Sequence, residues 1–294
     1  MLLEIEQLKV CYGKVTALDI REPIRIEKGD RIGIIGSNGA GKSTLVKSLL
    51  GIVDYDGSVR STIKPEDMAV HMQFNEYADT MAVRYIMEAI LQTKIRENQK
   101  LQELIEFFEF EECLSKKYKV LSGGQKQRFT IIMVMMQDAP LTFYDEVTSG
   151  LDFETRQRLV EKLTQWYRDK DSALCVVSHY YEELEQLADK LLILDKGRVA
   201  AFGTKEELFA RYCGRSIVIM DRNEKNEKLA DGYRRLHAPE HLIALSCDSM
   251  EQEKVLTGRL IEENVNYKRS NHDIEMIFIN AKEQMEGEAA EVYA

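Results

Sequence analysis

A glycine-rich stretch at residues 36–44 constrains the fold of this chain more than any other part of its sequence. The stretch fits the pattern G-x-x-x-x-G-K-[S/T], which is typical of loops that bind the phosphates of a nucleotide. An apolar, β-branched run at 31–35 predicts a buried strand before the loop. The helical spacing of apolar residues at 44–50, which stops at Gly51, predicts a helix after it. The sequence therefore predicts an α/β fold with an anion site at a helix N-terminus.

The residue types in this loop suit the binding of phosphate. Glycines allow the backbone to curl around the phosphates because they have no Cβ. The Lys42 ammonium is expected to contact the β- and γ-phosphates, and the Ser43 hydroxyl is expected to bind Mg²⁺. The predicted nucleotide-binding residues of the loop are Gly36, Ser37, Asn38, Gly39, Ala40, Gly41, Lys42, Ser43 and Thr44.

The composition indicates a globular protein and disfavours nucleic acid as a partner. The chain has 294 residues, of which 44% are hydrophobic, enough for a sizeable core in one large or two modest domains. A net charge of −10 argues against a nucleic-acid binder, which normally has a basic face. The five cysteines are scattered without a C-x-x-C pair, so we expect small buried thiols rather than disulfides or zinc ligands.

The sequence predicts neither a signal peptide nor a membrane-spanning segment. Acidic residues interrupt the apolar run at 1–6, which is not the pattern of a signal peptide. The longest apolar run, at 129–136, is too short to cross a bilayer. If the protein serves a membrane, we expect another chain to cross it.

Periodicity predicts two regions of different character. Up to residue 213, predicted strands alternate with predicted helices, which favours a mostly parallel sheet, and a helical segment is inserted at about 75–137. From 214 the pattern restarts as a small α+β appendage. It has predicted strands at 216–220, 241–246 and 265–267, a polar connection at 222–228, a helix at 250–263, a closing helix at 272–279 and a frayed acidic tail from Gln284.

Three further groups of polar residues stand at element ends. Ser122 and the two glycines that follow it open a predicted helix and form a second candidate anion site. Two acids, Asp145 and Glu146, end a predicted strand; the first suits Mg²⁺ and the second suits a base that polarises water. His179 ends another predicted strand.

These motifs together resemble the nucleotide-binding domain of ATP-binding cassette (ABC) transporters over about residues 1–212. The resemblance implies an α/β P-loop cassette with a mixed central sheet, an antiparallel β subdomain and a helical subdomain that carries the signature motif. It implies ATP and Mg²⁺ as cofactors, with metal contacts from Ser43, Gln73 and Asp145. It also implies that Tyr12 stacks on adenine.

The resemblance also implies roles in catalysis and in dimer formation. Glu146 is implied to be the catalytic glutamate, His179 the switch histidine, and Gln73 a glutamine that senses the membrane partner. Asp152 is implied to lie at the dimer seam. The signature residues, which contact the ATP bound to the opposite subunit, correspond to Ser122, Gly123, Gly124 and Gln125.

A head-to-tail dimer follows from the two anion sites. One triphosphate cannot comfortably contact both helix starts within a single protomer, so we expect each ATP to lie between two subunits, identical or different. ATP binding then closes the dimer and hydrolysis opens it. The sequence departs from the family pattern at Val147, where the family usually has proline, and in the bulky apolar residues of 131–136. We expect neither departure to abolish activity.

The ending at 273–279 is similar to that of cytoplasmic ATPases of bacterial type-2 ABC exporters. The resemblance therefore implies the motor subunit of an exporter, bound to transmembrane permease chains at the inner face of the membrane. A soluble ABC ATPase scaffold, as in iron–sulfur cluster assembly, is an alternative. A P-loop kinase or GTPase is a third, which the signature and Glu146 disfavour.

Overall fold

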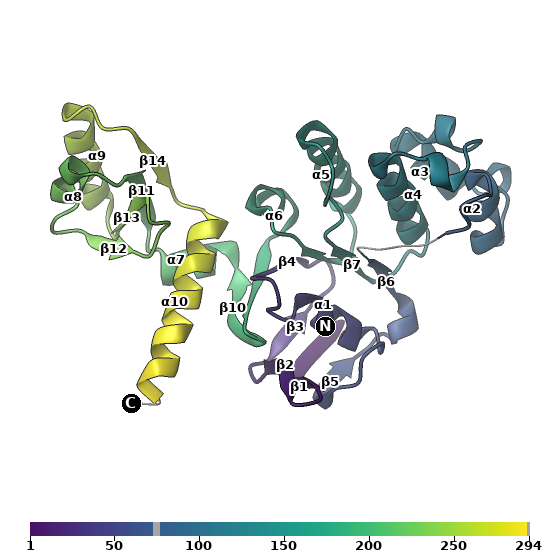
Figure 1. Cartoon of the computed structure of the whole chain (residues 1–294), viewed down its shortest axis with the longest axis horizontal. Helices are drawn as coiled ribbons and strands as arrows, with labels where there is room; N and C mark the ends of the chain where they lie inside the picture. Colours follow the sequence, from purple (N-terminus) through teal and green to yellow (C-terminus); the bar gives the residue numbers. More distant parts are fainter. Residues whose placement is uncertain (73–76, 293–294) are drawn as a thin grey trace.

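A six-stranded sheet lies at the centre of the computed structural model, which describes residues 1–72 and 77–292 (Figure 1). Strands β4, β6, β7, β8 and β9 of this sheet are parallel, and β10 joins its edge antiparallel to β9. In spatial order the strands are β10 (Arg198–Thr204), β9 (Lys190–Asp195), β4 (Arg31–Gly36), β8 (Ala173–Val177), β7 (Leu141–Asp145) and β6 (Met68–His71). The prediction of a mostly parallel sheet is confirmed. Its inner strands are buried along their whole length, as expected for strands covered on both faces.

A smaller antiparallel sheet covers the helix that follows the glycine-rich loop. Its central strand, β1 (Leu3–Tyr12), pairs with β2 (Val15–Ile20), β3 (Ile24–Ile26) and β5 (Asp56–Ser61). The apolar side chains of this sheet, of the helix α1 (Lys42–Leu49) and of one face of the central sheet form one core. Strand β2 was missed at the sequence level because its first residues are exposed and carry no apolar alternation.

Helices form a separate end of the molecule, as Figure 1 shows. The inserted helices are α2 (Val83–Leu91), α3 (Gln99–Phe107) and α4 (Gly123–Met135), with 3₁₀ helices at Pro65–Asp67, Ile95–Glu97, Glu111–Cys113 and Tyr118–Val120. Helix α3 ends at Phe107, and Glu109 then adopts a positive φ of 52°, which reverses the chain. Helices α5 (Phe153–Tyr167) and α6 (Tyr181–Leu187) join this end to the central sheet through a second apolar core.

The segment from residue 216 folds around a third sheet, which is antiparallel. Its elements are β11 (Ser216–Asp221), α8 (Glu224–Leu229), β12 (Arg234–Leu236), β13 (Leu242–Cys247), α9 (Met250–Glu262) and β14 (Tyr267–Ser270). The order β12-β13-β11-β14 makes it a split βαβ arrangement. The prediction of a polar connection at 222–228 is wrong, because the Asn223 side chain accepts from the Asn226 N–H and caps a helix there. Strand β12 was not predicted.

Both faces of this third sheet are buried. Val218 and Met220 face α8 and α9, whereas Ile217 and Ile219 face the core that includes α7 (Lys205–Tyr212) and α10 (Ile274–Val292). Because that core continues into the central region, it crosses the predicted boundary between residues 213 and 214. The boundary stays a prediction.

The prediction of a frayed tail from Gln284 is wrong, because helix α10 includes this segment. The chain does not fray at Gln284 but stays helical up to Val292. Its first turns bury Met276, Ile277 and Ala281, and the helix contacts α6, α7, β9 and β10, so tertiary packing holds its start in place. The residues that follow are rich in Ala, Glu and Gln, which favour a helix. In the described part of the chain, no helix is long and apolar enough to cross a membrane.

The buried histidine of β6 gives the fold a pH-dependent stability. His71 is 1% exposed, and its ring nitrogens have no hydrogen-bond partner among the described residues. Burial lowers its pKa to about 4. Below a pH of about 6.5 the unfolded chain binds a proton that the folded chain does not, so the free energy of unfolding falls until the pH reaches about 4.

We expect urea unfolding to show a loss of about 2 kcal/mol between about pH 7.5 and about pH 5 from this residue alone. The variant His71→Leu removes the titrating group and should flatten that part of the pH dependence. The exposed His241→Leu is the matched control and should keep the wild-type slope. Equal slopes in wild type and His71→Leu would contradict the assignment.

Candidate functional site

The carboxyl ends of the parallel strands gather the candidate site at one edge of the central sheet. Strand β4 leads into the glycine-rich loop, β7 ends at Asp145 and β8 ends two residues before His179. In an open parallel sheet, ligands bind at this edge. A cleft of about 200 Å³ opens there, lined by Ala17, Asn38, Gly39, Ala40, Gly41, Lys42, Ser43, Thr44, Glu146 and His179.

Two glycines fix the shape of the loop. A Cβ on Gly36 would collide with the Leu194 carbonyl oxygen of the neighbouring strand. Gly41 has a φ of 101°, and a Cβ there would lie 2.8 Å from Leu18 Cδ1. A residue with a side chain fits neither position, so the loop can keep this tight curve only with glycine.

The Lys42 ammonium lies inside the curve of the loop. Its Nζ donates to the Gly36 carbonyl oxygen at 2.7 Å and to the Ser37 carbonyl oxygen at 3.2 Å. Burial lowers the pKa of Lys42, while the carboxylates of Glu146 and Asp145 oppose that shift. A buried cation beside the free N–H groups of a helix start is an arrangement that attracts phosphate.

Hard oxygen donors lie at the first turn of α1. The Ser43 hydroxyl donates to Asp145 Oδ2 at 3.0 Å. Burial raises the pKa of Asp145, although this hydrogen bond lowers it. A hydroxyl and one carboxylate are donors that Mg²⁺ prefers when phosphates and water supply the remaining ligands. The residues present therefore fit the predicted metal.

Glu146 and His179 face each other across the cleft. His179 Nε2 lies 3.0 Å from Glu146 Oε1. Glu146 has a positive φ of 51°, and its N–H donates to the Val177 carbonyl oxygen at 2.9 Å. The left-handed region of φ costs conformational energy for a residue other than glycine, and residues in this conformation are enriched at functional sites. The next residue, Val147, is buried in the core, which fixes the turn without the proline of the family pattern.

A buried acid of α6 holds the turn that carries His179, and sequence reasoning missed it. Glu183 Oε2 accepts from the Ser178 hydroxyl at 2.8 Å, and that hydroxyl accepts from the Tyr180 N–H at 3.0 Å. Glu183 Oε1 lies 3.7 Å from the Arg156 guanidinium on α5. The spacing of four residues from His179 was the available signal, but one acid among several in this helix could not be singled out.

The predicted signature residues lie away from this cleft. Ser122 accepts from the Gln125 N–H and its own N–H donates to the Gln125 side chain, so the pair forms a capping box at the start of α4. A Cβ on Gly123 would meet nothing within 4 Å, so this helix start is open to a ligand. Asp152 caps α5 by accepting from the Thr155 N–H at 3.0 Å.

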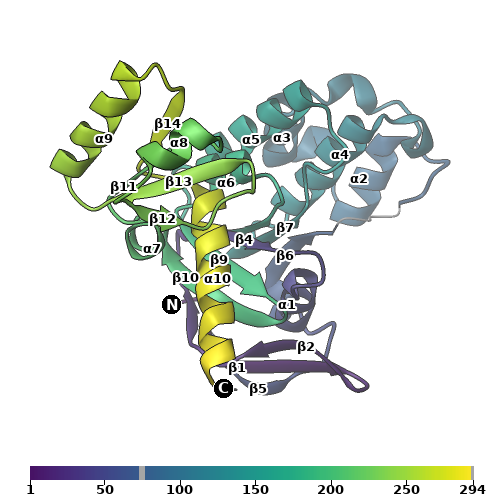
Figure 2. The ribbon, with the colours of Figure 1, turned by 60° about the vertical axis from the view of Figure 1, so that its left-hand side comes forward.

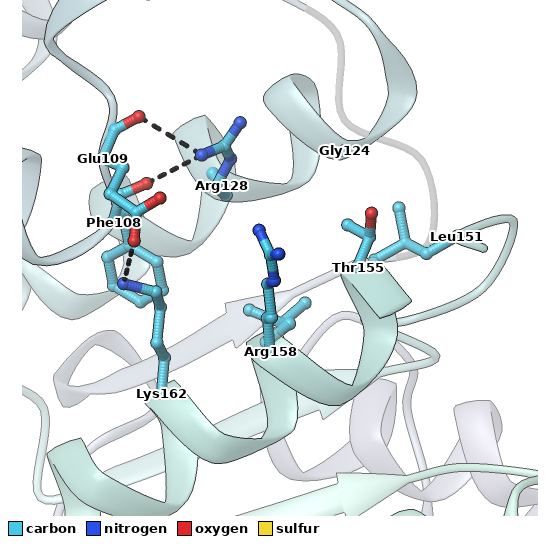
Figure 3. Close-up of a pocket in the computed structure, with 9 residues that line it drawn as sticks. Phe108, Glu109, Gly124, Arg128, Leu151, Thr155, Arg158 and Lys162 are labelled. Atoms are coloured by element: carbon cyan, nitrogen blue, oxygen red, sulfur yellow. Dashed lines mark hydrogen bonds and ion pairs between the residues drawn. The ribbon is translucent and has the colours of Figure 1, made fainter. Parts of the chain in front are cut away.

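The signature helix and α5 border a second pocket, of about 110 Å³, which Figure 3 shows. Gly124 lies beside Thr155 and Leu151 on one side of it, with Phe108, Glu109 and Lys162 on the other. Arg128 donates to the carbonyl oxygens of Phe108 and Glu109, beyond the end of α3. This cation therefore stabilises a helix end. The fold thus brings the signature near Asp152 and apart from the glycine-rich loop of the same chain.

Tyr12, the predicted adenine-stacking residue, does not line the cleft. Tyr12 ends β1 and is 52% exposed, and it is Ala17 on the adjoining strand that reaches the cleft. Its role in adenine stacking stays a prediction. Gln73 lies outside the described residues.

The turn between β9 and β10 contacts the glycine-rich loop through two hydrogen bonds. The Ser37 hydroxyl donates to Asp195 Oδ1 at 3.1 Å, and the Gly197 N–H donates to the Ala40 carbonyl oxygen at 3.2 Å. Sequence reasoning did not place Asp195 or Gly197 at the site. No local sequence pattern marks this contact, because it depends on the parallel pairing of β9 with β4.

Comparison with known proteins identifies proteins of similar sequence. Residues 23–149 match the family model described as ABC transporter. The chain is 27% identical to the linearmycin resistance ATP-binding protein LnrL of Bacillus subtilis, and the match covers 95% of this chain and 97% of that protein. It is 32% identical to the methionine import ATP-binding protein MetN of Corynebacterium glutamicum, over 67% of this chain and 60% of that protein.

Solved structures share the fold. The ATP-binding subunit of an ABC transporter superposes with a TM-score of 0.64 at 22% identity, over 73% of this chain and 95% of that one. A dimeric ATP-binding cassette in a post-hydrolysis state, bound to ADP and Pi, gives a TM-score of 0.61 at 20% identity, over 69% of this chain and 98% of that one. These likenesses confirm the predicted fold class.

We expect Lys42→Ala to raise the dissociation constant for ATP at least about tenfold, because hydrogen bonds to charged groups contribute about 1.5–3 kcal/mol. The measurement is equilibrium titration with a fluorescent ATP analogue, alongside thermal unfolding. The control is Lys47→Ala, on the same helix but outside the cleft lining, which should bind like the wild type. An unchanged affinity in a folded Lys42→Ala variant would contradict the assignment of the loop.

Proposed function

The chain belongs to the ABC transporter ATP-binding proteins and is an ATPase, and on this premise we propose that it is the motor subunit of an exporter. It works as a head-to-tail dimer, bound to separate transmembrane permease chains at the inner face of the membrane. The observation that carries the export assignment is the relative LnrL, named for resistance, which matches 95% of this chain. That match extends over the segment from residue 216, whereas MetN matches 67% of the chain.

The chemistry of hydrolysis follows from the cleft. Lys42 and the loop N–H groups hold the β- and γ-phosphates, which keeps the terminal phosphorus in place for attack. Glu146 accepts a hydrogen bond from the attacking water and polarises it, and His179, within 3.0 Å of Glu146, orients that carboxylate. Ser43 and Asp145 would hold Mg²⁺, which neutralises charge on the phosphate oxygens when bound.

The separation of the two anion sites supports a dimeric catalytic unit. The open helix start at Ser122 and Gly123 does not line the cleft of its own chain. A second subunit turned head to tail would present its own signature to the γ-phosphate bound here. ATP then bridges two subunits, which makes its binding a closing force and its hydrolysis a release.

We expect Glu146→Gln to lower the rate of phosphate release by about 10²–10⁴-fold, because the amide has the shape of the carboxylate but is a poor base. ATP affinity should stay within about threefold, and light scattering should show a stable ATP-bound dimer. The matched control is Glu154→Gln, an exposed acid of α5 paired with Arg158, which should hydrolyse ATP like the wild type. A turnover of Glu146→Gln near that of the control would contradict the catalytic role.

The direction of transport is tested in cells that lack this protein. If it powers an exporter, the deletion strain becomes more sensitive to members of a panel of membrane-active antibiotics. The wild-type chain then restores resistance and the Glu146→Gln chain does not. A deletion strain with unchanged sensitivity that needs added methionine to grow would instead assign the protein to import. Co-purification from native membranes identifies the permease in either case.

A further inference from the structure

The turn between β9 and β10 joins the nucleotide-binding loop to a helix from the far end of the chain. On one side of the turn, Asp195 accepts from the Ser37 hydroxyl and Gly197 donates to Ala40, as described above. The turn also packs closely against β2, because a Cβ on Gly197 would lie 2.8 Å from the Ala17 carbonyl oxygen. A movement of this turn therefore moves the loop.

Asp195 is a buried acid that the proposed catalytic mechanism does not use. Its side chain is 1% exposed, and Oδ2 has no hydrogen-bond partner in the described part of the chain. A buried carboxylate is costly unless a cation lies nearby. Lys282 on α10 provides that cation, with Nζ 3.9 Å from Asp195 Oδ1.

Helix α10 contacts the same turn a second time. One helical turn beyond Lys282, the Glu286 carboxylate accepts from Lys196 Nζ at 2.6 Å. Figure 2 shows α10 running along β9 and β10, in agreement with the contacts between these elements. Two residues before Lys282, α10 is also anchored to the third sheet, because the Asn280 side chain pairs with the backbone N–H and carbonyl oxygen of His237, next to β12.

We propose that Asp195 is a positioning residue for the nucleotide-binding loop, and that α10, through Lys282 and Glu286, couples the segment at 216–292 to nucleotide affinity. This inference rests on the proposed binding of nucleotide at residues 36–44. A loop held in its bound shape loses less conformational entropy on binding, so the α10 contacts raise affinity. By reciprocity, nucleotide binding strengthens the contacts of α10 with the turn. A change in the third sheet that shifts α10 thereby changes ATP occupancy.

Hydrogen exchange of the full chain, with and without MgADP, tests the coupling. We expect MgADP to slow amide exchange in the loop at 36–44 and also in α10 at 280–287. In Ser37→Ala, which removes the side-chain link to Asp195 and leaves the backbone link from Gly197 to Ala40, the loop should still be protected while the protection of α10 falls. Protection of the wild-type loop without protection of α10 would overturn this inference. Absence of protection in the wild-type loop would instead overturn the proposed nucleotide site.

Affinity measurements test whether Asp195 positions the nucleotide-binding loop or only stabilises the fold. We expect Asp195→Ala to raise the dissociation constant for MgADP at least about tenfold, as loss of a hydrogen bond to a charged group implies. Ser37→Ala should give a similar loss, and the double variant no further loss. Additive losses would overturn the positioning role. If Asp195→Ala does not fold, Asp195→Asn keeps an acceptor for Ser37 but loses the attraction to Lys282, and it should abolish the α10 protection.

Variants of Lys282 and Glu286 test the contacts that α10 makes with the turn between β9 and β10. We expect the double variant Lys282→Gln/Glu286→Gln to raise the dissociation constant about threefold, because partly exposed ion pairs contribute little each. Its unfolding temperature should match that of Glu275→Gln, an exposed acid of α10 away from the turn, which should bind like the wild type. A lowered unfolding temperature with unchanged affinity would show a purely structural role and overturn the coupling.

Discussion

The parallel pairing of β4 with β8 and β9, and of β8 with β7, is the constraint on which the rest of the site depends. Parallel strands end at the same edge, so residues more than a hundred positions apart meet there without any local sequence signal. The Ser43 hydroxyl reaches Asp145, and Glu146 reaches His179, because these strands are in register. The glycines of the loop then allow its backbone to bend tightly enough to leave a cleft at that edge.

Two groups of charges in the chain serve different physical purposes. Around the cleft, Lys42 and Asp145 are buried. Burial lowers the pKa of Lys42 and raises the pKa of Asp145, which favours the neutral form of each side chain. Such a site favours a ligand that brings compensating charge, as a metal-bound triphosphate does. Near the signature, by contrast, Arg128 is already bonded to backbone carbonyl oxygens at the end of α3. The cation there stabilises the helical end of the molecule, although the pocket beside it is similar in appearance to a ligand site.

Periodicity in the sequence predicted the elements with strong apolar patterns. It failed for elements whose formation depends on tertiary contacts. The helix predicted at 250–263 is observed as α9, because apolar residues at helical spacing, Leu256 and Leu260, are buried on one side of it. Helix α8 is polar along most of its length and begins only because Asn223 caps it. Helix α10 continues through a predicted frayed tail because its first turns are buried against the core. Short strands such as β12 carry too few residues for an alternation to be visible.

The sequence by itself determined the chemistry: the loop of glycines with Lys42 and Ser43, the acid pair at Asp145 and Glu146, and the family that this combination resembles. These are local patterns, in which residue type and spacing carry the information. Only the tertiary structure decided which residues meet. It placed the signature outside the cleft of its own chain, set Glu183 behind the turn of His179, and brought α10 to Asp195 beside Ser37. Contacts of this kind depend on sheet register and helix packing, which no local pattern encodes.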